Sequence, residues 1–384
     1  MKPSLLFAAI LLFTGCVEST SHKDPAPLNT IDWGFTAFEK VDSLNPILQP
    51  SPEMVFTDPI TGAVAKWEER NVLNPTAVVK DGKVHLLYRA QDLDGTSRIG
   101  MAVSDDGLHF EKMAAPVFHP DQDSMKRYEW NYKKTDGEQT NSEDCYFCYF
   151  DGVEDPRIVE SQSGEYIMTY TSYDGKTARL SIASSKDLET WTKHGVVLSG
   201  EKYQDTWSKA GAIIGELQGN RIVAKQINGK YWMYFGDTDI FMATSSDLIN
   251  WEVSENEESK KRISVLHPRM GYFDSRLVEP GPYALVREEG ILLIYNGSNA
   301  ANFNDPALPK FTYAAGQALF DLENPYKQID RKESYFIHPD KDYEKVGEVN
   351  EVCFVEGLVY FKDKWFLYYG TADSKIAVAV SDGY

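Results

Sequence analysis

Three segments, MAVSDDGLHFEKM (101–113), SIASSKDLETWTKHG (181–195) and FMATSSDLINWEVS (241–254), repeat one pattern along the chain. In each, a short strand of small residues ends in serine, an Asp-Gly or Asp-Leu turn follows, and an aromatic residue begins the next strand. Turns of this composition between apolar strands are typical of antiparallel hairpins. Three copies in one register therefore predict a repeated antiparallel sheet.

A pair of strands joined by a tight polar turn precedes each of these segments. The same unit recurs in YALVREEGILLIYNG (283–297) and CFVEGLVYFKDKWFLYYG (353–370), which raises the number of units to five. Five such units without a long helical pattern predict an all-β fold, a five-bladed β-propeller. The alternative, a two-sheet sandwich or jelly roll, does not explain five repeats. The last segment, IAVAVSDGY (376–384), lacks a final strand, and we expect strand-like residues before Asn71 to supply it.

The chain begins with a basic residue and an apolar run, LLFAAILLF, that is too short to span a bilayer, as in a signal peptide. The run ends in LFTGC, which is similar to the bacterial lipoprotein box and predicts acylation of Cys16. We therefore expect a signal peptide at 1–16, a polar tether at 17–30 and one propeller domain at 31–384. The protein would be exported and lipid-anchored, in the periplasm or on the cell surface of a Gram-negative bacterium. An ordinary signal peptide is the alternative.

Composition limits the partners. The formal net charge of −19 repels a phosphate backbone, so we expect no nucleic-acid partner. The histidines are scattered without the spacing of metal ligands, and no Gly-rich loop leads from a strand into a helix, so we expect neither a metal nor another cofactor. Cys145 and Cys148 can close a small disulfide or stay free, and Cys353 is expected in the core.

Polar or acidic residues open the first strand of several units. They are Asn74 before Pro75, Glu154 and Asp155 before Pro156, Glu279 before Pro280, and Asn350 with Glu351. Because the first strand of each propeller blade lines the central channel, we predict that these side chains converge in one site. For a single case, proline at the start of a strand is the simpler explanation, but the repetition favours a site. The long polar insertion at 114–150 is expected to cover it.

Several motifs resemble those of glycoside hydrolase family 130. They are LLYRAQ (86–91), GVEDPRIV (152–159), the SKDLETW turn, FDLENP (320–325), YEKVGEVNEVCFVEG (343–357) and YYGTADSKIAVA (368–379). The resemblance runs from about Asn71 to the C-terminus with the motifs in the same order. It implies a five-bladed propeller that acts on β-mannosides, as a β-mannosidase or a β-mannoside phosphorylase. The implied partner is an oligosaccharide substrate.

The resemblance assigns the general acid to Asp155, whose proton would reach the leaving oxygen through a sugar hydroxyl. It places Arg89 and Arg98 at sugar-contacting positions, where guanidinium groups suit vicinal hydroxyls. Arg157 either lowers the pKa of Asp155, binds a hydroxyl or forms a structural ion pair. The other predicted substrate contacts are Asn74, Glu154, Tyr173, Lys209, Tyr313 and Asp373, with packing as the alternative for the two tyrosines.

The incoming nucleophile is either phosphate or water. Phosphorylases of the family typically carry His-Arg-Pro where this chain has Phe235-Gly236-Asp237, although Lys209 keeps the lysine of a second phosphorylase motif. Acids in place of bases repel phosphate and can activate water. We therefore predict an inverting hydrolase of β-1,2- or β-1,4-linked manno-oligosaccharides, with Glu279 as the base and Asp237 as its partner or substitute.

The Asp237 assignment has alternatives, because the resemblance implies a glutamate at that position in hydrolases. Asp237 could bind sugar hydroxyls, Asp239 could take its place, or both could only cap a turn. Two other functions are also compatible with the sequence. One is phosphorolysis that releases mannose 1-phosphate, and the other is a non-catalytic sugar-binding lipoprotein.

Overall fold

The computed structural model describes residues 33–35, 38–134 and 149–382. The chain divides into two units after Asp32, and all described residues belong to the second unit. The predicted signal peptide, Cys16 and the tether lie outside the described residues, as do Cys145 and Cys148. No helix among the described residues is long and apolar enough to cross a membrane.

The described chain is nearly all β. Its helical elements are short: α1 (Lys126–Glu129), the 3₁₀ turn η1 (Tyr132–Lys134) and α2 (Asp342–Lys345). A two-stranded ribbon of β2 (Phe56–Thr57) and β3 (Val64–Ala65) precedes the main strands. Most of the other strands pair with their neighbours in sequence, so the predicted all-β class is confirmed.

The main strands pair in five antiparallel groups, called sheets below, and short parallel pairings connect several of these groups. The first contains β4 (Asn71–Lys80), β5 (Lys83–Gln91), β6 (Thr96–Ser104) and β7 (Glu111–Lys112). The second contains β8 (Asp151–Glu160), β9 (Tyr166–Tyr173), β10 (Ala178–Ser185) and β11 (Trp191–Val196). The third contains β12 (Ala212–Gln218), β13 (Arg221–Ala224), β14 (Tyr231–Phe235), β15 (Ile240–Ser245), β16 (Trp251–Val253) and β17 (Ser264–Leu266).

The fourth and fifth sheets follow the same scheme. The fourth contains β18 (Leu277–Pro280), β19 (Ala284–Arg287), β20 (Gly290–Ser298), β21 (Tyr313–Phe320) and β22 (Gln328–Arg331). The fifth contains β23 (Cys353–Phe361), β24 (Lys364–Thr371), β25 (Lys375–Ser381) and β1 (Glu39–Lys40). Strand β1, from the other end of the chain, pairs with β25. The expected completion of the last sheet by residues before Asn71 is therefore confirmed.

The three repeated sequence segments fold into the same turn. In the second copy the Ser185 hydroxyl accepts hydrogen bonds from the backbone N–H groups of the next turn residues, and the Asp187 carboxylate accepts two more. Ser104 with Asp106 and Ser245 with Asp247 make the same bonds in the other copies. Each turn joins two paired strands, β6 to β7, β10 to β11 and β15 to β16. The predicted repeated hairpin is confirmed.

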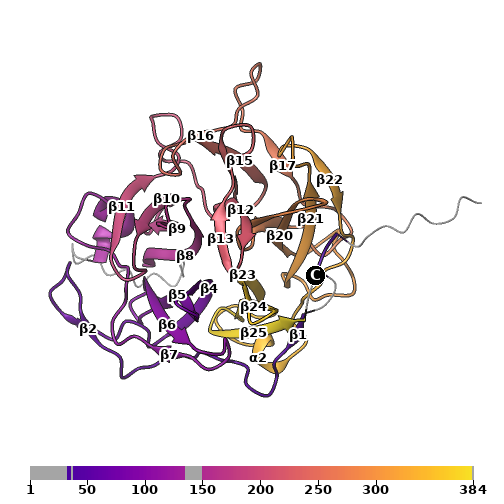
Figure 1. The fold of residues 1–384 in the computed structure, drawn as a ribbon. Helices are drawn as coiled ribbons and strands as arrows, with labels where there is room; N and C mark the ends of the chain where they lie inside the picture. The colour runs from indigo at the N-terminus through magenta and orange to yellow at the C-terminus, as the bar shows by residue number, and fades with distance from the viewer. Residues whose placement is uncertain (1–32, 36–37, 135–148, 383–384) are drawn as a thin grey trace, which may run out of the picture. The chain divides into compact units, whose positions relative to one another are not determined.

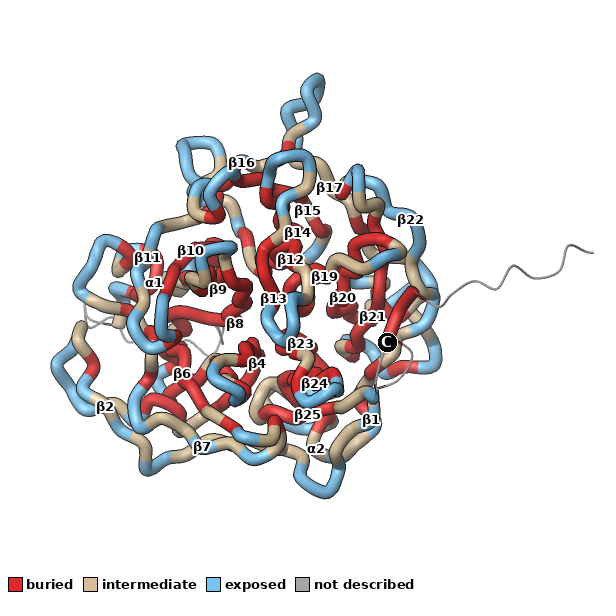
Figure 2. Tube along the Cα trace, in the orientation of Figure 1, coloured by how far each residue is buried: buried red, intermediate tan, exposed pale blue. Residues whose placement is uncertain are grey.

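The sheets are arranged around a common centre (Figure 1). Strands β4, β8, β12 and β23 lie near this centre, and β7, β11, β16 and β22 lie at the periphery. The apolar core fills the space between neighbouring sheets, as where Val78 and Leu87 of the first sheet pack with Ile158 and Met168 of the second. Figure 2 shows that the buried segments follow the inner strands and that the exposed segments are mainly loops. Buried Cys353 is part of this core, as predicted.

Candidate active site

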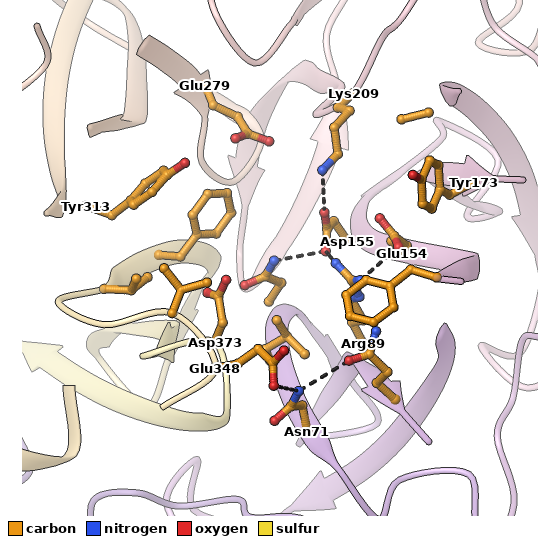
Figure 3. Close-up of a pocket in the computed structure, with 18 of the residues that line it drawn as sticks. Asn71, Arg89, Glu154, Asp155, Tyr173, Lys209, Glu279, Tyr313, Glu348 and Asp373 are labelled. Atoms are coloured by element: carbon orange, nitrogen blue, oxygen red, sulfur yellow. Dashed lines mark hydrogen bonds and ion pairs between the residues drawn. The ribbon is translucent and has the colours of Figure 1, made fainter. Parts of the chain in front are cut away.

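A cavity of about 480 Å³ opens among the inner strands, and it gathers side chains from four of the five sheets and from the loops between them. Its volume is in the range of sites for small ligands. Nine of the twelve predicted site residues line it: Asn74, Arg89, Glu154, Asp155, Tyr173, Lys209, Glu279, Tyr313 and Asp373. Figure 3 shows Asp155 and Glu279 in this shared cavity. The predicted convergence is thus observed for Asn74, Glu154, Asp155 and Glu279, but it is wrong for Asn350 and Glu351, which do not line the cavity.

Local backbone distortions aim three of these side chains. Asn74 and Asp155 have left-handed φ angles of 46° and 52°, and both sit where the strand register shifts, in β4 and β8. Asp373, in the turn before β25, has a φ of 49°. Such conformations cost about 1–3 kcal/mol each and cluster at functional sites. The Asn74 amide donates a hydrogen bond of 2.9 Å to Asp155 Oδ1. This bond connects the two register shifts in β4 and β8.

Asp155 is held as a carboxylate. Burial by itself would raise its pKa, but the positive charges of Arg89 and Lys209 outweigh burial and lower the pKa to about 2. Lys209 Nζ lies 3.6 Å from Asp155 Oδ2, and Arg89 Nη1 lies 3.4 Å from Oδ1. Arg89 also pairs with Glu154 at 2.8 Å. Asp155 is therefore ionised over the whole neutral range.

The pKa of Glu279, at the inner end of the fourth sheet, is shifted in the opposite direction to that of Asp155. Burial raises its pKa to about 8, and the charge of Asp237 adds to this effect while Lys209 opposes it. The Glu279 side chain therefore keeps its proton at neutral pH. Nearby Asp373 is also shifted, because burial raises its pKa to about 6 against the attraction of Arg89.

The two carboxyl groups together hold one proton between about pH 2 and about pH 8. A pair whose pKa values are pushed apart in one cavity is the arrangement that supports general acid and base chemistry. At rest the proton is on Glu279, whereas the predicted roles place it on Asp155. The predicted donor therefore has to receive the proton before it can deliver it.

Arg157 has a structural role in place of the predicted substrate contact. It does not line the cavity, and its guanidinium donates to the carbonyls of Gly281 and Pro280 at 2.6 and 2.9 Å. Its Nη1 lies 2.8 Å from Glu356 Oε1 without the angle of a hydrogen bond. Burial raises the pKa of Glu356 well above its ordinary value, against the pull of Arg157. Arg157 thus ties the strand that carries Asp155 to the residues that follow Glu279.

Arg98 is also structural, in place of the predicted sugar contact. It is 2% exposed, and its guanidinium donates to Asp58 at 2.7 Å and to Asp92 at 2.6 Å. It does not line the cavity. Two loop carboxylates, Asp58 after β2 and Asp92 after β5, therefore take the hydrogen bonds that a sugar hydroxyl would need.

Asp237 and Asp239 lie outside the cavity lining. The Asp237 carboxylate accepts a 2.6 Å hydrogen bond from the indole N–H of Trp207, and Asp239 contacts His267 at 2.8 Å. Gly236, which precedes Asp237, has a φ of 132°, and an added Cβ would lie 2.1 Å from the carbonyl oxygen of Asp239. This turn therefore requires glycine and fixes where Asp237 points.

The cavity also contains residues that sequence reasoning missed. Trp207 and Arg276 stand two and three positions before the predicted Lys209 and Glu279, so proximity to those residues was an available signal. Glu348 lines the cavity and pairs with Arg70 at 2.8 Å; it lies in the segment YEKVGEVNEVCFVEG (343–357), so this motif was an available signal, although it does not single out Glu348. Phe150, the last residue of the polar insertion, reaches the cavity as expected, but 135–148 lie outside the described residues. Within the described part of the chain, no group of three or more His, Cys, Asp or Glu could hold a metal ion.

An all-β domain with two carboxyl groups of opposite pKa shift in one cavity is typical of enzymes that process glycosidic bonds. Comparison with known proteins narrows this class. The model of glycoside hydrolase family 130, described as β-1,4-mannooligosaccharide phosphorylase, matches residues 133–382. The chain belongs to this family, which confirms the resemblance seen in its motifs.

Some relatives are named as phosphorylases, and others are described as glycosidases or with hydrolases. A 1,2-β-oligomannan phosphorylase from Thermoanaerobacter sp. (strain X514) is 30% identical over 82% of this chain and 91% of the relative. A solved structure of a putative glycosidase from Bacteroides thetaiotaomicron VPI-5482 is 41% identical, with a TM-score of 0.85 over 92% of this chain and 99% of the other. A third, 40% identical with a TM-score of 0.85 over 91% of this chain and 95% of the other, is described in connection with family members that hydrolyse β-1,2-mannosidic linkages in Candida mannan.

Proposed function

We propose that this enzyme hydrolyses β-mannosidic bonds in manno-oligosaccharides with inversion at the anomeric carbon. The observation that carries the proposal is the pair Asp155 and Glu279, which face one cavity from different sheets and hold one proton between them. The similarity to structures described as a glycosidase and as relatives of β-1,2-mannan hydrolases supports the same substrate class.

The proposed reaction uses both carboxyl groups. Asp155 protonates the leaving oxygen, through a sugar hydroxyl, as the C1–O bond breaks, and water adds to C1 from the opposite face. Glu279 takes the proton that this water loses. The reaction therefore ends with Glu279 protonated and Asp155 ionised, which is the state that their environments favour. Return of the proton from Glu279 to Asp155 then readies the site for the next turnover.

The charges around the cavity favour water over phosphate as the acceptor. The lining carries five carboxyl groups against three basic side chains, and two of those bases, Arg89 and Lys209, are paired with acids. A phosphate dianion needs basic groups that are free to bind it. The acidic Asp237, placed where the resemblance implies His-Arg-Pro in phosphorylases, adds to the repulsion.

Phosphorolysis is the second candidate, because the curated relatives are named phosphorylases. One lining group also favours it. Arg276 is exposed in the cavity and stands over the ring of Phe311, and no carboxylate pairs with it among the described contacts. Together with Lys209 it could bind one phosphate. An Arg276→Ala variant that loses phosphate-dependent turnover but keeps turnover in water would assign phosphate binding to Arg276.

Two experiments test the proposal. Purified protein is incubated with β-1,2- and β-1,4-linked manno-oligosaccharides with and without phosphate, and free mannose in both conditions is expected. Mannose 1-phosphate formed only with phosphate would establish phosphorolysis instead. Glu279→Ala should stop turnover in water, and azide, which needs no base, should restore it and give an inverted mannosyl azide. Azide that fails to restore a folded Glu279→Ala variant would remove Glu279 from the role of base.

We infer that the five sheets are the blades of a five-bladed β-propeller. The radial arrangement of the sheets, the antiparallel pairing within each, and the joining of β1 to β25 support this architecture. Propellers often close by placing both chain ends in one sheet. An experimental structure in which these sheets stack face to face would contradict it.

We further propose that residues 1–16 are a signal peptide, that residues 17–30 are a tether, and that Cys16 carries a lipid that anchors the propeller to a membrane. The LFTGC sequence supports this proposal. In cells, the wild type should partition into the detergent phase and lose its first 15 residues, while Cys16→Ser should not be acylated. Equal partitioning of both proteins into the aqueous phase would contradict it.

A further inference from the structure

Trp207 stands out among the exposed apolar residues. It is 46% exposed and lines the cavity, whereas other large exposed apolar side chains, such as Met270 and Phe303, do not. A single exposed apolar residue is ordinary on a protein surface. Trp207 differs because its polar end has a fixed partner: the indole N–H donates to Asp237 Oδ2 at 2.6 Å.

The segment that carries Trp207 is held on both sides. Arg179 donates to the carbonyl of Gln204 at 2.9 Å and to Asp205 at 2.8 Å. After the tryptophan, the Ser208 hydroxyl accepts from the N–H of Leu180 at 3.0 Å, and its own N–H bonds to Ala178. The indole is therefore fixed both by its backbone and by its N–H.

The same segment connects this indole to the reacting groups. Lys209, two residues further on, reaches Asp155, and its carbonyl accepts a hydrogen bond of 2.9 Å from the N–H of Gly236. Gly236 directly precedes Asp237. Two hydrogen bonds therefore connect the Trp207–Lys209 segment to the Gly236–Asp237 turn: one from Trp207 to Asp237 and one from Gly236 to Lys209. Tyr173, which also lines the cavity, meets the Trp207 ring edge to face, with centroids 6.1 Å apart.

We propose that Trp207 is a platform for the apolar face of a pyranose ring at the cavity mouth, and that Asp237 is a positioning residue that holds this platform. The inference rests on the proposed function and adds to it a binding position for a further sugar unit of an uncharged oligosaccharide. A pyranose ring presents C–H bonds to an aromatic face, and a ring already fixed in place loses little entropy on binding. The Asp237 carboxylate is engaged with the indole, so this assignment replaces its predicted part in activating water.

Paired variants separate the two roles of Asp237. Asp237→Asn keeps an oxygen that accepts the indole N–H but cannot act as a base, whereas Asp237→Ala removes both. A positioning role predicts that Asp237→Asn keeps kcat and KM within about twofold of the wild type, and that Asp237→Ala raises KM. Loss of kcat by about 10²–10⁴ in Asp237→Asn would instead make it a base and overturn the proposal. Asp239→Asn is the matched control for removing a charge nearby.

A binding experiment tests the platform independently of turnover. In an Asp155→Asn background, calorimetry with β-1,2- and β-1,4-mannotriose should show about tenfold weaker binding when Trp207→Ala is added, and a smaller loss with Trp207→Phe. Phe303→Ala, which removes an exposed ring outside the cavity, should not change binding. Equal affinity with and without Trp207, or no binding of either sugar by the Asp155→Asn protein, would overturn the platform. Failure of the wild type to cleave a sugar that it binds would overturn only the hydrolytic function.

Discussion

Replacement of Lys209 by glutamine should move the acid limb of the pH profile of kcat/KM to higher pH. Below the pKa of Asp155 both carboxyl groups are protonated and no base is left, so that pKa sets the limb. Lys209 Nζ lies 3.6 Å from Asp155 Oδ2. At an effective dielectric constant of about 20, two unit charges at this separation attract each other by about 5 kcal/mol, or about three pH units.

The side chain of Lys209 is 20% exposed, so solvent screening reduces the expected change to about two to three pH units. The pKa of Asp155 should therefore rise from about 2 to roughly 4–5, and the acid limb should become visible while the wild-type profile stays flat on the acid side of neutrality. The alkaline limb should move in the same direction, because Lys209 also opposes protonation of Glu279.

The assay is the initial rate of oligosaccharide cleavage from about pH 3 to about pH 9, with circular dichroism at each pH to confirm that the protein is folded. The position of the limb is the readout, so a general loss of affinity in the variant does not affect it. Lys209→Arg keeps the charge and should keep the wild-type profile. An acid limb in the same place for Lys209→Gln and the wild type would refute the idea that this ammonium sets the pKa of Asp155.

Three further outcomes are expected. The wild-type kcat/KM should fall tenfold per pH unit above about pH 8, where the proton on Glu279 is lost; a flat profile to about pH 10 would show that the site does not depend on it. Arg157→Met should reduce the free energy of unfolding, measured in urea, by about 3–5 kcal/mol because it leaves the carbonyls of Gly281 and Pro280 buried without their charged donor; a loss below about 1 kcal/mol would argue against this structural role. Gly236→Ala should lower the melting temperature and raise KM, because its Cβ would collide with the Asp239 carbonyl; unchanged values of both would contradict the turn geometry.

The fold was largely predictable because its information is local. The Ser-x-Asp turns are made by residues two and three positions apart, so the three copies are visible in the sequence and recur as identical hydrogen-bond patterns. The last strand of the fifth sheet was also predictable, since the C-terminal end stops one strand short. Residues with left-handed backbone, such as Asn74 and Asp155, stand before proline, which marked them as unusual before their geometry was known.

The roles of individual side chains were less predictable. Arg98, Arg157 and Asp237 all carry charges suited to a sugar site, but each is engaged by a partner distant in sequence: Asp58, the carbonyl of Gly281 and Trp207. Which charged group is free to bind a ligand depends on such partners. Glu348 shows the converse, because it lies in the motif at 343–357 and was not singled out there, yet its carboxylate lines the cavity.

The anomeric form of the first product decides whether Asp155 and Glu279 catalyse inverting hydrolysis. Proton NMR during cleavage of a β-linked manno-oligosaccharide in phosphate-free buffer should show α-mannose first, followed by slow mutarotation, because water attacks the face opposite the leaving group. Mannose that appears first as the β anomer, or no mannose until phosphate is added, would contradict inverting hydrolysis by Asp155 and Glu279.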